Sequence, residues 1–122
     1  MDSKNLHVIS FKYAFEGILA ALKEEPNLKF HFLAGLVIII LSFLLNISTR
    51  DWIIILILIG LVISVELTNT AIEAVIDGFT EVHHPAAKLA KDISAGAVLV
   101  AAATAAIVGI LIFLPYLSLW II

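Results

Sequence analysis

The chain has 122 residues, of which 62% are hydrophobic and only 14% charged, and its formal net charge is −3. A soluble globular domain is roughly half apolar and about a quarter charged, so this composition indicates an integral membrane protein, too short for a second domain. The sequence contains no cysteine, which excludes disulfide bonds, thiolate chemistry and cysteine-based zinc sites.

Residues 6–24 have the pattern of an amphipathic helix. Its apolar face is formed by Phe11, Phe15, Ile18 and Leu22. The segment carries too many charges to span a bilayer, so we expect it to lie at the membrane surface with Tyr13 near the lipid headgroups. Packing of this helix on the protein's own core is the alternative, and both arrangements can hold at once.

Two apolar segments that follow are long enough to cross a membrane. Pro26 favours the start of a new helix, and residues 28–47 form the first predicted span. A short polar turn separates it from the second span, predicted over residues 52–77, and Trp52 opens that span as an interfacial anchor. Both segments are interpreted as transmembrane helices.

A third span is predicted over residues 93–120, after a polar connection at residues 78–87. The first half of this span is largely alanine and glycine, and small faces let helices approach closely in lipid. Tight packing against another helix or another subunit is therefore expected here. The sequence predicts an all-α membrane protein with one surface helix and three transmembrane helices, in a single domain over residues 1–122.

The basic residues indicate how the chain is oriented in the membrane. Those that precede the first span are Lys4, Lys12, Lys23 and Lys29. Lys88 and Lys91 follow the second span, so two crossings bring them to the same side. The positive-inside rule then places the N-terminus in the cytoplasm and the C-terminus outside.

A polar stripe runs through the second span and is formed by Glu66, Asn69, Glu73 and Asp77. Their spacing returns each side chain to nearly the same direction on an α-helix. A carboxylate in hydrocarbon costs at least about 2.5 kcal/mol, so intramembrane carboxylates usually face protein or water and usually have a function. Oxygen ligands at this density suit Mg²⁺. The alternative is a hydrogen-bonded seam that only holds helices together.

The stripe also leads from the membrane interior into water. At about 1.5 Å per residue, Glu66 lies roughly 21 Å and Asp77 roughly 37 Å from Trp52, against a hydrocarbon core of about 30 Å. A site along this stripe would suit a reaction between a substrate dissolved in the membrane and one dissolved in water.

Further candidate residues flank the stripe. Glu25 could share a divalent ion with Glu73, or it could be a solvated charge at a helix start. Lys91 could hold a polyphosphate, or it could mark the membrane boundary. The pair His83–His84 is interpreted as loop polarity or a nucleotide contact, since no further histidine or cysteine lies nearby to complete a metal site. His31 stays open between a headgroup contact and a substrate contact.

Composition alone leaves two classes open, an ion-handling membrane protein and an enzyme at the membrane interface. Neither a P-loop nor a soluble protein-kinase motif is present. Residues 66–77 (ELTNTAIEAVID), followed by residues 90–92 (AKD) and residues 95–99 (AGAVL), closely resemble the bacterial integral-membrane diacylglycerol kinase family. The resemblance covers essentially the whole chain. Residues 83–88 (HHPAAK), with His31, are similar to the Gram-positive branch, whose members resemble undecaprenol kinases.

The resemblance implies a homotrimer with MgATP-dependent active sites shared between neighbouring subunits, and it implies no nucleic-acid partner. Glu66 would be the catalytic base, Asn69 would shape the site, and Lys91 would add positive charge at the transferred phosphoryl group. Glu25 and Glu73 would bind Mg²⁺ and ATP. The remaining nucleotide contacts would be Tyr13, Asp77, His83, His84, Lys91 and Asp92.

The expected function is transfer of the γ-phosphoryl group of ATP to the hydroxyl of a membrane lipid in the bacterial plasma membrane. Undecaprenol, giving undecaprenyl phosphate, is the expected acceptor, and diacylglycerol, giving phosphatidic acid, is the alternative. A non-catalytic ion-handling or scaffold membrane protein is the alternative from another class. Leu6 and His7 stand where relatives commonly carry an arginine, so no N-terminal basic contact is assigned.

Overall fold

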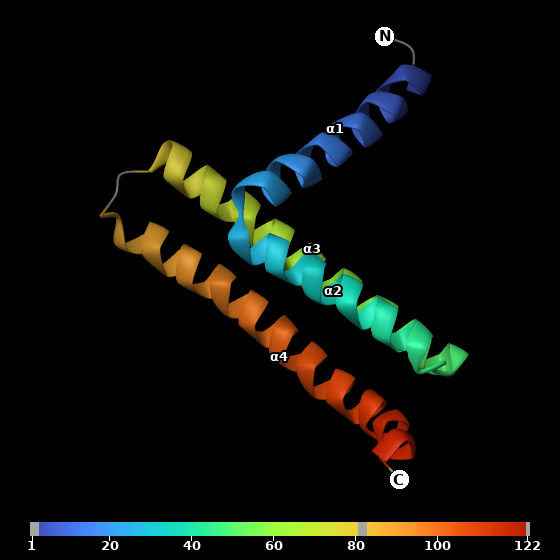
Figure 1. Cartoon of the computed structure of the whole chain (residues 1–122). Helices are drawn as coiled ribbons and strands as arrows, with labels where there is room; N and C mark the ends of the chain where they lie inside the picture. The colour runs from blue at the N-terminus through green and yellow to red at the C-terminus, as the bar shows by residue number, and fades with distance from the viewer. Residues whose placement is uncertain (1–2, 81–82, 122) are drawn as a thin grey trace.

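The computed structural model describes residues 3–80 and 83–121, and the regular secondary structure within them is entirely α-helical. The helices are α1 (Ser3–Glu24), α2 (Pro26–Leu44), α3 (Thr49–Phe79) and α4 (Pro85–Ile121) (Figure 1). Helices α2, α3 and α4 are each long and apolar enough to cross a membrane. The predicted all-α membrane fold, with one N-terminal helix and three spanning helices, is confirmed.

Helix α1 extends away from the other three helices (Figure 1). Its C-terminal part is packed, where Ile18 and Leu22 are half-buried and the helix meets α2 and α3. Phe11 and Phe15, on the same apolar face, are exposed. The first part of this face is therefore available to lipid, as expected for a helix at the membrane surface.

Helix α4 begins earlier than the sequence predicted. Pro85 occupies its first position, where the fixed φ of proline suits a helix start. Lys88 Nζ donates to Asp92 Oδ2 at 2.6 Å, one turn along the helix. The prediction of a polar connection over residues 78–87 was wrong at both ends, because α3 continues to Phe79 and α4 already begins at Pro85.

The turn between α2 and α3 is held by polar contacts. Asn46 has a φ of 52°, a left-handed conformation that asparagine tolerates and that ends α2 earlier than predicted. Ser48 caps α3, since its Oγ accepts from the Asp51 N–H at 3.2 Å. The Tyr116 hydroxyl of α4 accepts from the Ser48 N–H at 3.0 Å and donates to Asp51 Oδ2 at 2.5 Å. The last part of α4 is thereby tied to this turn.

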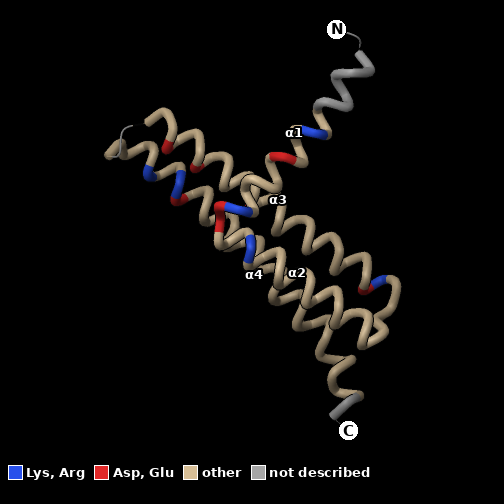
Figure 2. Tube along the Cα trace, turned by 45° about the horizontal axis from the view of Figure 1, so that its top comes forward, with Lys and Arg blue, Asp and Glu red and all other residues tan. Residues whose placement is uncertain are grey.

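Helix α3 packs along both α2 and α4, which flank it (Figure 1). The C-terminal end of α3 and the start of α4 lie at one end of the bundle, beyond the start of α2, and the α2–α3 turn lies at the other. Figure 2 shows charged residues gathered toward the first end, an uncharged middle, and one acidic and basic pair at the opposite end. This distribution is that of a protein with two aqueous ends and an apolar centre.

Candidate functional site

Glu66 is buried in the middle of α3, with a relative exposure of 2%. Its Oε2 atom has no hydrogen-bond partner among the described residues. It faces His31 of α2, whose Nε2 lies 3.8 Å from Oε2, a distance too long for a direct hydrogen bond. Glu25 and Glu73 also act on Glu66 electrostatically. A buried carboxylate without a partner is costly, so this position is the first candidate for catalysis.

Asn69, one turn further along α3, is also buried but is satisfied. Its Oδ1 accepts from Ser94 Oγ of α4 at 2.6 Å, and both side chains are buried. Asn69 therefore fits the alternative interpretation of the polar stripe, in which a residue forms a hydrogen bond that holds two helices together. Ser94 was not predicted as a site residue, although it lies three residues after Lys91 and so near the same face of α4.

The water-facing end of the stripe forms a polar recess of about 500 Å³ between α3 and α4. It is lined by Ile76, Asp77, Thr80, His84, Ala87, Lys88, Lys91 and Asp92. Lys91 Nζ donates to Asp77 Oδ1 at 2.8 Å across the two helices. The recess brings together the predicted nucleotide contacts Asp77, His84, Lys91 and Asp92 in a space with both basic and acidic groups.

Besides Glu25 and Glu73, two predicted nucleotide contacts lie outside the recess. Tyr13 is exposed on α1 and His83 is exposed before α4, and neither is among the described residues that line the polar recess. His84 has a local role as well, because its Nδ1 accepts from the Ala86 N–H at 3.2 Å at the start of α4. This contact satisfies one of the free N–H groups of the first helical turn.

Glu25 and Glu73 are the two carboxylates that the sequence predicts as cation ligands. Glu25 is the N-cap residue of α2, yet its half-buried side chain makes no capping hydrogen bond. Glu73 is half-buried and follows Glu66 by about two turns of α3, so it lies between the buried carboxylate and the polar recess, whose first lining residue on α3 is Ile76. No three His, Asp or Glu side chains converge among the described residues. Two carboxylates still fit Mg²⁺, which usually completes its shell with phosphate oxygens and water.

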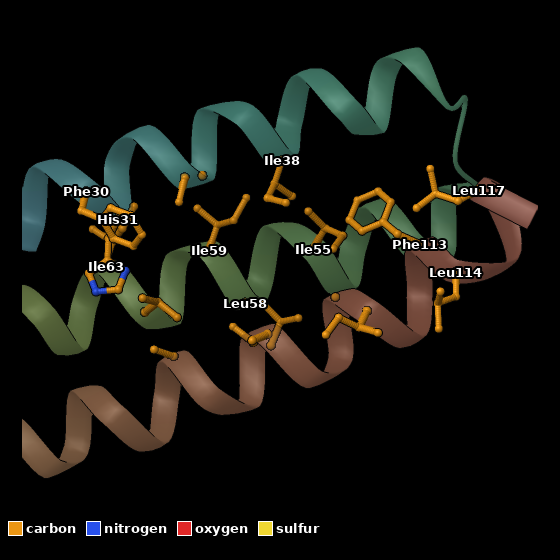
Figure 3. A pocket seen from close by; sticks show the side chains of 18 residues that line it. Phe30, His31, Ile38, Ile55, Leu58, Ile59, Ile63, Phe113, Leu114 and Leu117 are labelled. Carbon is orange, nitrogen blue, oxygen red and sulfur yellow. The ribbon is translucent and has the colours of Figure 1, made fainter. Parts of the chain in front are cut away.

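An apolar groove of about 480 Å³ lies between α2 and α4, over α3 (Figure 3). Its walls are formed by Phe30, His31, Ala34, Gly35, Ile38, Ile55, Leu58, Ile59, Val62, Ile63, Ala102, Ala105, Ala106, Gly109, Ile110, Phe113, Leu114 and Leu117. His31 is the one polar side chain among these described residues and lies at one end, with Leu117 at the other (Figure 3). The groove therefore leads through apolar surface to the histidine that faces Glu66.

The groove changes the interpretation of the small residues in α4. They were expected to serve close packing, and Ala101 is indeed buried. Ala102, Ala105, Ala106 and Gly109, however, line the groove. Because these side chains occupy little volume, α4 leaves space for an apolar ligand beside α2.

Comparisons with known proteins agree with this architecture. The sequence profile described as prokaryotic diacylglycerol kinase matches residues 12–113. The chain is 46% identical to the undecaprenol kinase of Bacillus subtilis (strain 168), over 96% of this chain and 100% of the relative. It is 38% identical to a diacylglycerol kinase of Synechocystis, over 88% of this chain and 62% of the relative, and 30% identical to that of Escherichia coli (strain K12), over 78% of each. The chain belongs to the prokaryotic diacylglycerol kinase family.

Proposed function

We propose that this protein is an ATP- and Mg²⁺-dependent lipid kinase that phosphorylates undecaprenol in the bacterial plasma membrane, as a single kinase domain. The observation that carries the proposal is the buried Glu66 carboxylate, which faces the polar end of the apolar groove. The same helix extends from this carboxylate to the polar recess. Undecaprenol is chosen because the relative named undecaprenol kinase matches this chain over 96% of its length.

The reaction joins the lipid hydroxyl to the terminal phosphoryl group of ATP. The hydroxyl oxygen forms a bond to the γ-phosphorus while the bond from that phosphorus to the β–γ bridging oxygen breaks, and ADP leaves. The hydroxyl proton passes to Glu66, which acts as general base. The products are the lipid monophosphate, ADP and one proton. Phosphoryl transfer depends mainly on alignment and charge stabilisation, which a small helical protein can supply.

Charged residues of the site would stabilise the phosphate groups. Lys91 would hold the polyphosphate as a point charge, with His84 and Asp92 at the edge of the same recess. Glu25 and Glu73 would hold Mg²⁺, which when bound would offset the negative charge of the transferred group. Asn69 would keep α3 and α4 in register through its hydrogen bond to Ser94.

The proposed assembly is a homotrimer with its N-termini in the cytoplasm. The cytoplasmic side is assigned from the clustering of basic residues on α1, the start of α2 and the start of α4. The polar recess then opens toward the compartment that contains ATP. The sites would be shared between subunits, and Tyr13 and His83, which do not line the recess of their own chain, would reach a nucleotide from such an arrangement.

The proposal is tested with purified protein in detergent, given ATP, Mg²⁺ and either undecaprenol or diacylglycerol. We expect phosphate on undecaprenol in preference to diacylglycerol. Glu66→Gln should lower kcat by about 10²-fold or more while ATP binding survives, because the general base is lost but the polar recess is intact. Wild-type turnover in this variant would remove Glu66 from the base role, and no phosphate on either lipid would refute the lipid kinase.

Diacylglycerol is the second candidate acceptor. It is favoured by the relatives from Synechocystis and Escherichia coli, which are named diacylglycerol kinases. A preference for diacylglycerol in the same assay would select this alternative and leave the proposed mechanism unchanged.

A further inference from the structure

His31 stands where the apolar groove meets the buried carboxylate. Its side chain is 17% exposed, and its ring packs edge-on against Phe30 with centroids 5.6 Å apart. Phe30 lines the same end of the groove (Figure 3). The imidazole is thus held between an apolar channel and Glu66.

His31 Nε2 and Glu66 Oε2 lie 3.8 Å apart, and Oε2 is covered by protein, so the two side chains must part before a third group can contact both. An oxygen about 2.8 Å from both atoms would then make two ordinary hydrogen bonds. A direct ion pair would instead bring the two atoms into hydrogen-bond contact, yet Oε2 has no such partner among the described residues. The pair therefore leaves one carboxylate oxygen unpaired beside a histidine nitrogen, and a small oxygen-bearing group that enters between them could bond to both.

The two side chains restrict the chemistry of that group. Oε2 of a carboxylate only accepts, so the bridging group must donate to it. A hydrogen carried on His31 Nε2 donates, so the same oxygen must accept from it. A hydroxyl satisfies both demands, whereas a carbonyl or an ether oxygen cannot donate to the carboxylate.

We propose that His31 and Glu66 together bind the hydroxyl of the acceptor lipid, whose apolar chain lies in the groove. This inference rests on the proposed lipid kinase function and adds a second residue that touches the reacting oxygen. His31 donates its Nε2–H to the hydroxyl oxygen, and the hydroxyl donates its hydrogen to Glu66 Oε2. When that proton passes to Glu66, the O–H electron pair is released on an oxygen whose orientation His31 has fixed, and it attacks the γ-phosphorus as ADP leaves.

The test compares His31→Leu and His31→Gln with the wild-type full-length protein in lipid–detergent micelles. Undecaprenol and ATP are varied separately, and dioleoylglycerol replaces undecaprenol if the wild type prefers it. His31→Leu should lower kcat/KM for the lipid by about tenfold or more, the effect of losing one hydrogen bond to a reacting group, with KM for ATP unchanged. His31→Gln should recover part of this loss, because its amide retains an N–H donor.

Two further measurements separate substrate binding from a structural role. ATP binding and thermal unfolding should be the same for His31→Leu and the wild type. The double variant His31→Leu, Glu66→Gln should be no slower than Glu66→Gln alone, because both residues act on one oxygen. Thr68→Val is the matched control, since Thr68 is exposed on α3 and lines neither the groove nor the recess among the described residues.

The contrary results distinguish failure of the role of His31 from failure of the lipid kinase proposal. Wild-type kinetics in His31→Leu would overturn the role of His31 and leave the lipid kinase standing. Loss of ATP binding in His31→Leu, or a folded His31→Gln as slow as His31→Leu, would also overturn it. Wild-type protein that phosphorylates neither lipid would overturn both proposals.

Discussion

Polar side chains near the site differ in whether the protein itself satisfies them. Asn69 is paired with Ser94, and Lys91 is paired with Asp77. Glu66 Oε2 has no hydrogen-bond partner among the described residues. A buried group left unsatisfied costs about 1–3 kcal/mol, and a charged one costs more. The paired residues therefore hold the helices in place, whereas the unpaired Glu66 is the residue that we propose contacts a substrate.

The cation of Lys91 should be needed for ATP rather than for the lipid. Lys91→Met should raise KM for ATP by roughly tenfold or more, the size expected for one charge-assisted hydrogen bond, with little change in KM for the lipid. Steady-state kinetics with each substrate varied in turn measure both. Arg50→Gln removes one positive charge beside the α2–α3 turn and should leave KM for ATP unchanged.

A double variant distinguishes phosphate binding from the ion pair alone. Lys91→Asp combined with Asp77→Lys preserves opposite charges between α3 and α4 but moves the cation to the other helix. If Lys91 contacts phosphate, this exchange should not restore KM for ATP. Full recovery would show that the ion pair is the only contribution of Lys91.

At the scale of helices, α3 and α4 are joined at both ends of the bundle. Near the polar recess, Asn69–Ser94 and Lys91–Asp77 cross the interface. At the opposite end, Tyr116 of α4 bonds to the turn that precedes α3. Beside this tie lies an apolar cluster, in which Ile55 and Phe113 are buried. This division leaves the wall of the groove free of polar contacts.

Tyr116→Phe should weaken the far end of the bundle without touching the site. The variant loses both hydrogen bonds of the hydroxyl, so its free energy of unfolding should fall by about 1–2 kcal/mol. Unfolding by sodium dodecyl sulfate in mixed micelles measures this change. Ser118→Ala is the control, because the Ser118 hydroxyl bonds only within α4, to the Pro115 carbonyl. An unchanged stability in Tyr116→Phe would show that the tie contributes nothing.

On the scale of the whole molecule, the distribution of charge predicts the orientation in the membrane. The native chain has no cysteine, so single cysteines can be introduced without background. In intact cells, an impermeant maleimide should label Thr49→Cys and Ser118→Cys, which lie toward the α2–α3 turn and the C-terminus. Ser10→Cys and Ala86→Cys should react only after the cells are opened. The reverse pattern would place the polar recess outside and would contradict an ATP-dependent function.

Much of the architecture could be predicted from the sequence because each span has a strong local pattern. Trp52 and the run of apolar residues after it indicate α3. The spacing of Glu66 and Asp77 indicates one polar stripe with a buried end and an exposed end. The start of α4 was missed, because a charged segment such as residues 85–92 resembles a loop when its i,i+4 pairing is unknown. The polar or apolar character of a segment therefore predicts its depth in the membrane better than it predicts the residues at which its helix begins and ends.

The groove and the partners of the stripe could not be predicted from the sequence. The groove depends on how far α2 and α4 stand apart, a distance that no local pattern encodes. The pairing of Asn69 with Ser94, and of Tyr116 with Asp51, depends on the register between helices. The facing position of His31 likewise required the structure, because residues 35 positions apart in sequence meet only through the packing of α2 on α3.

The unbroken course of α3 over 31 residues has a mechanical consequence. A rod of this length measures about 46 Å, longer than the roughly 30 Å hydrocarbon layer, so its final turns must project beyond the acyl chains. In the proposed mechanism both reactants bind along this one rigid helix, and the distance between their two binding sites is set by the rise of the helix. No hinge motion is then needed to bring the lipid hydroxyl and the nucleotide together, because folding of the helix already fixes the distance between their binding sites.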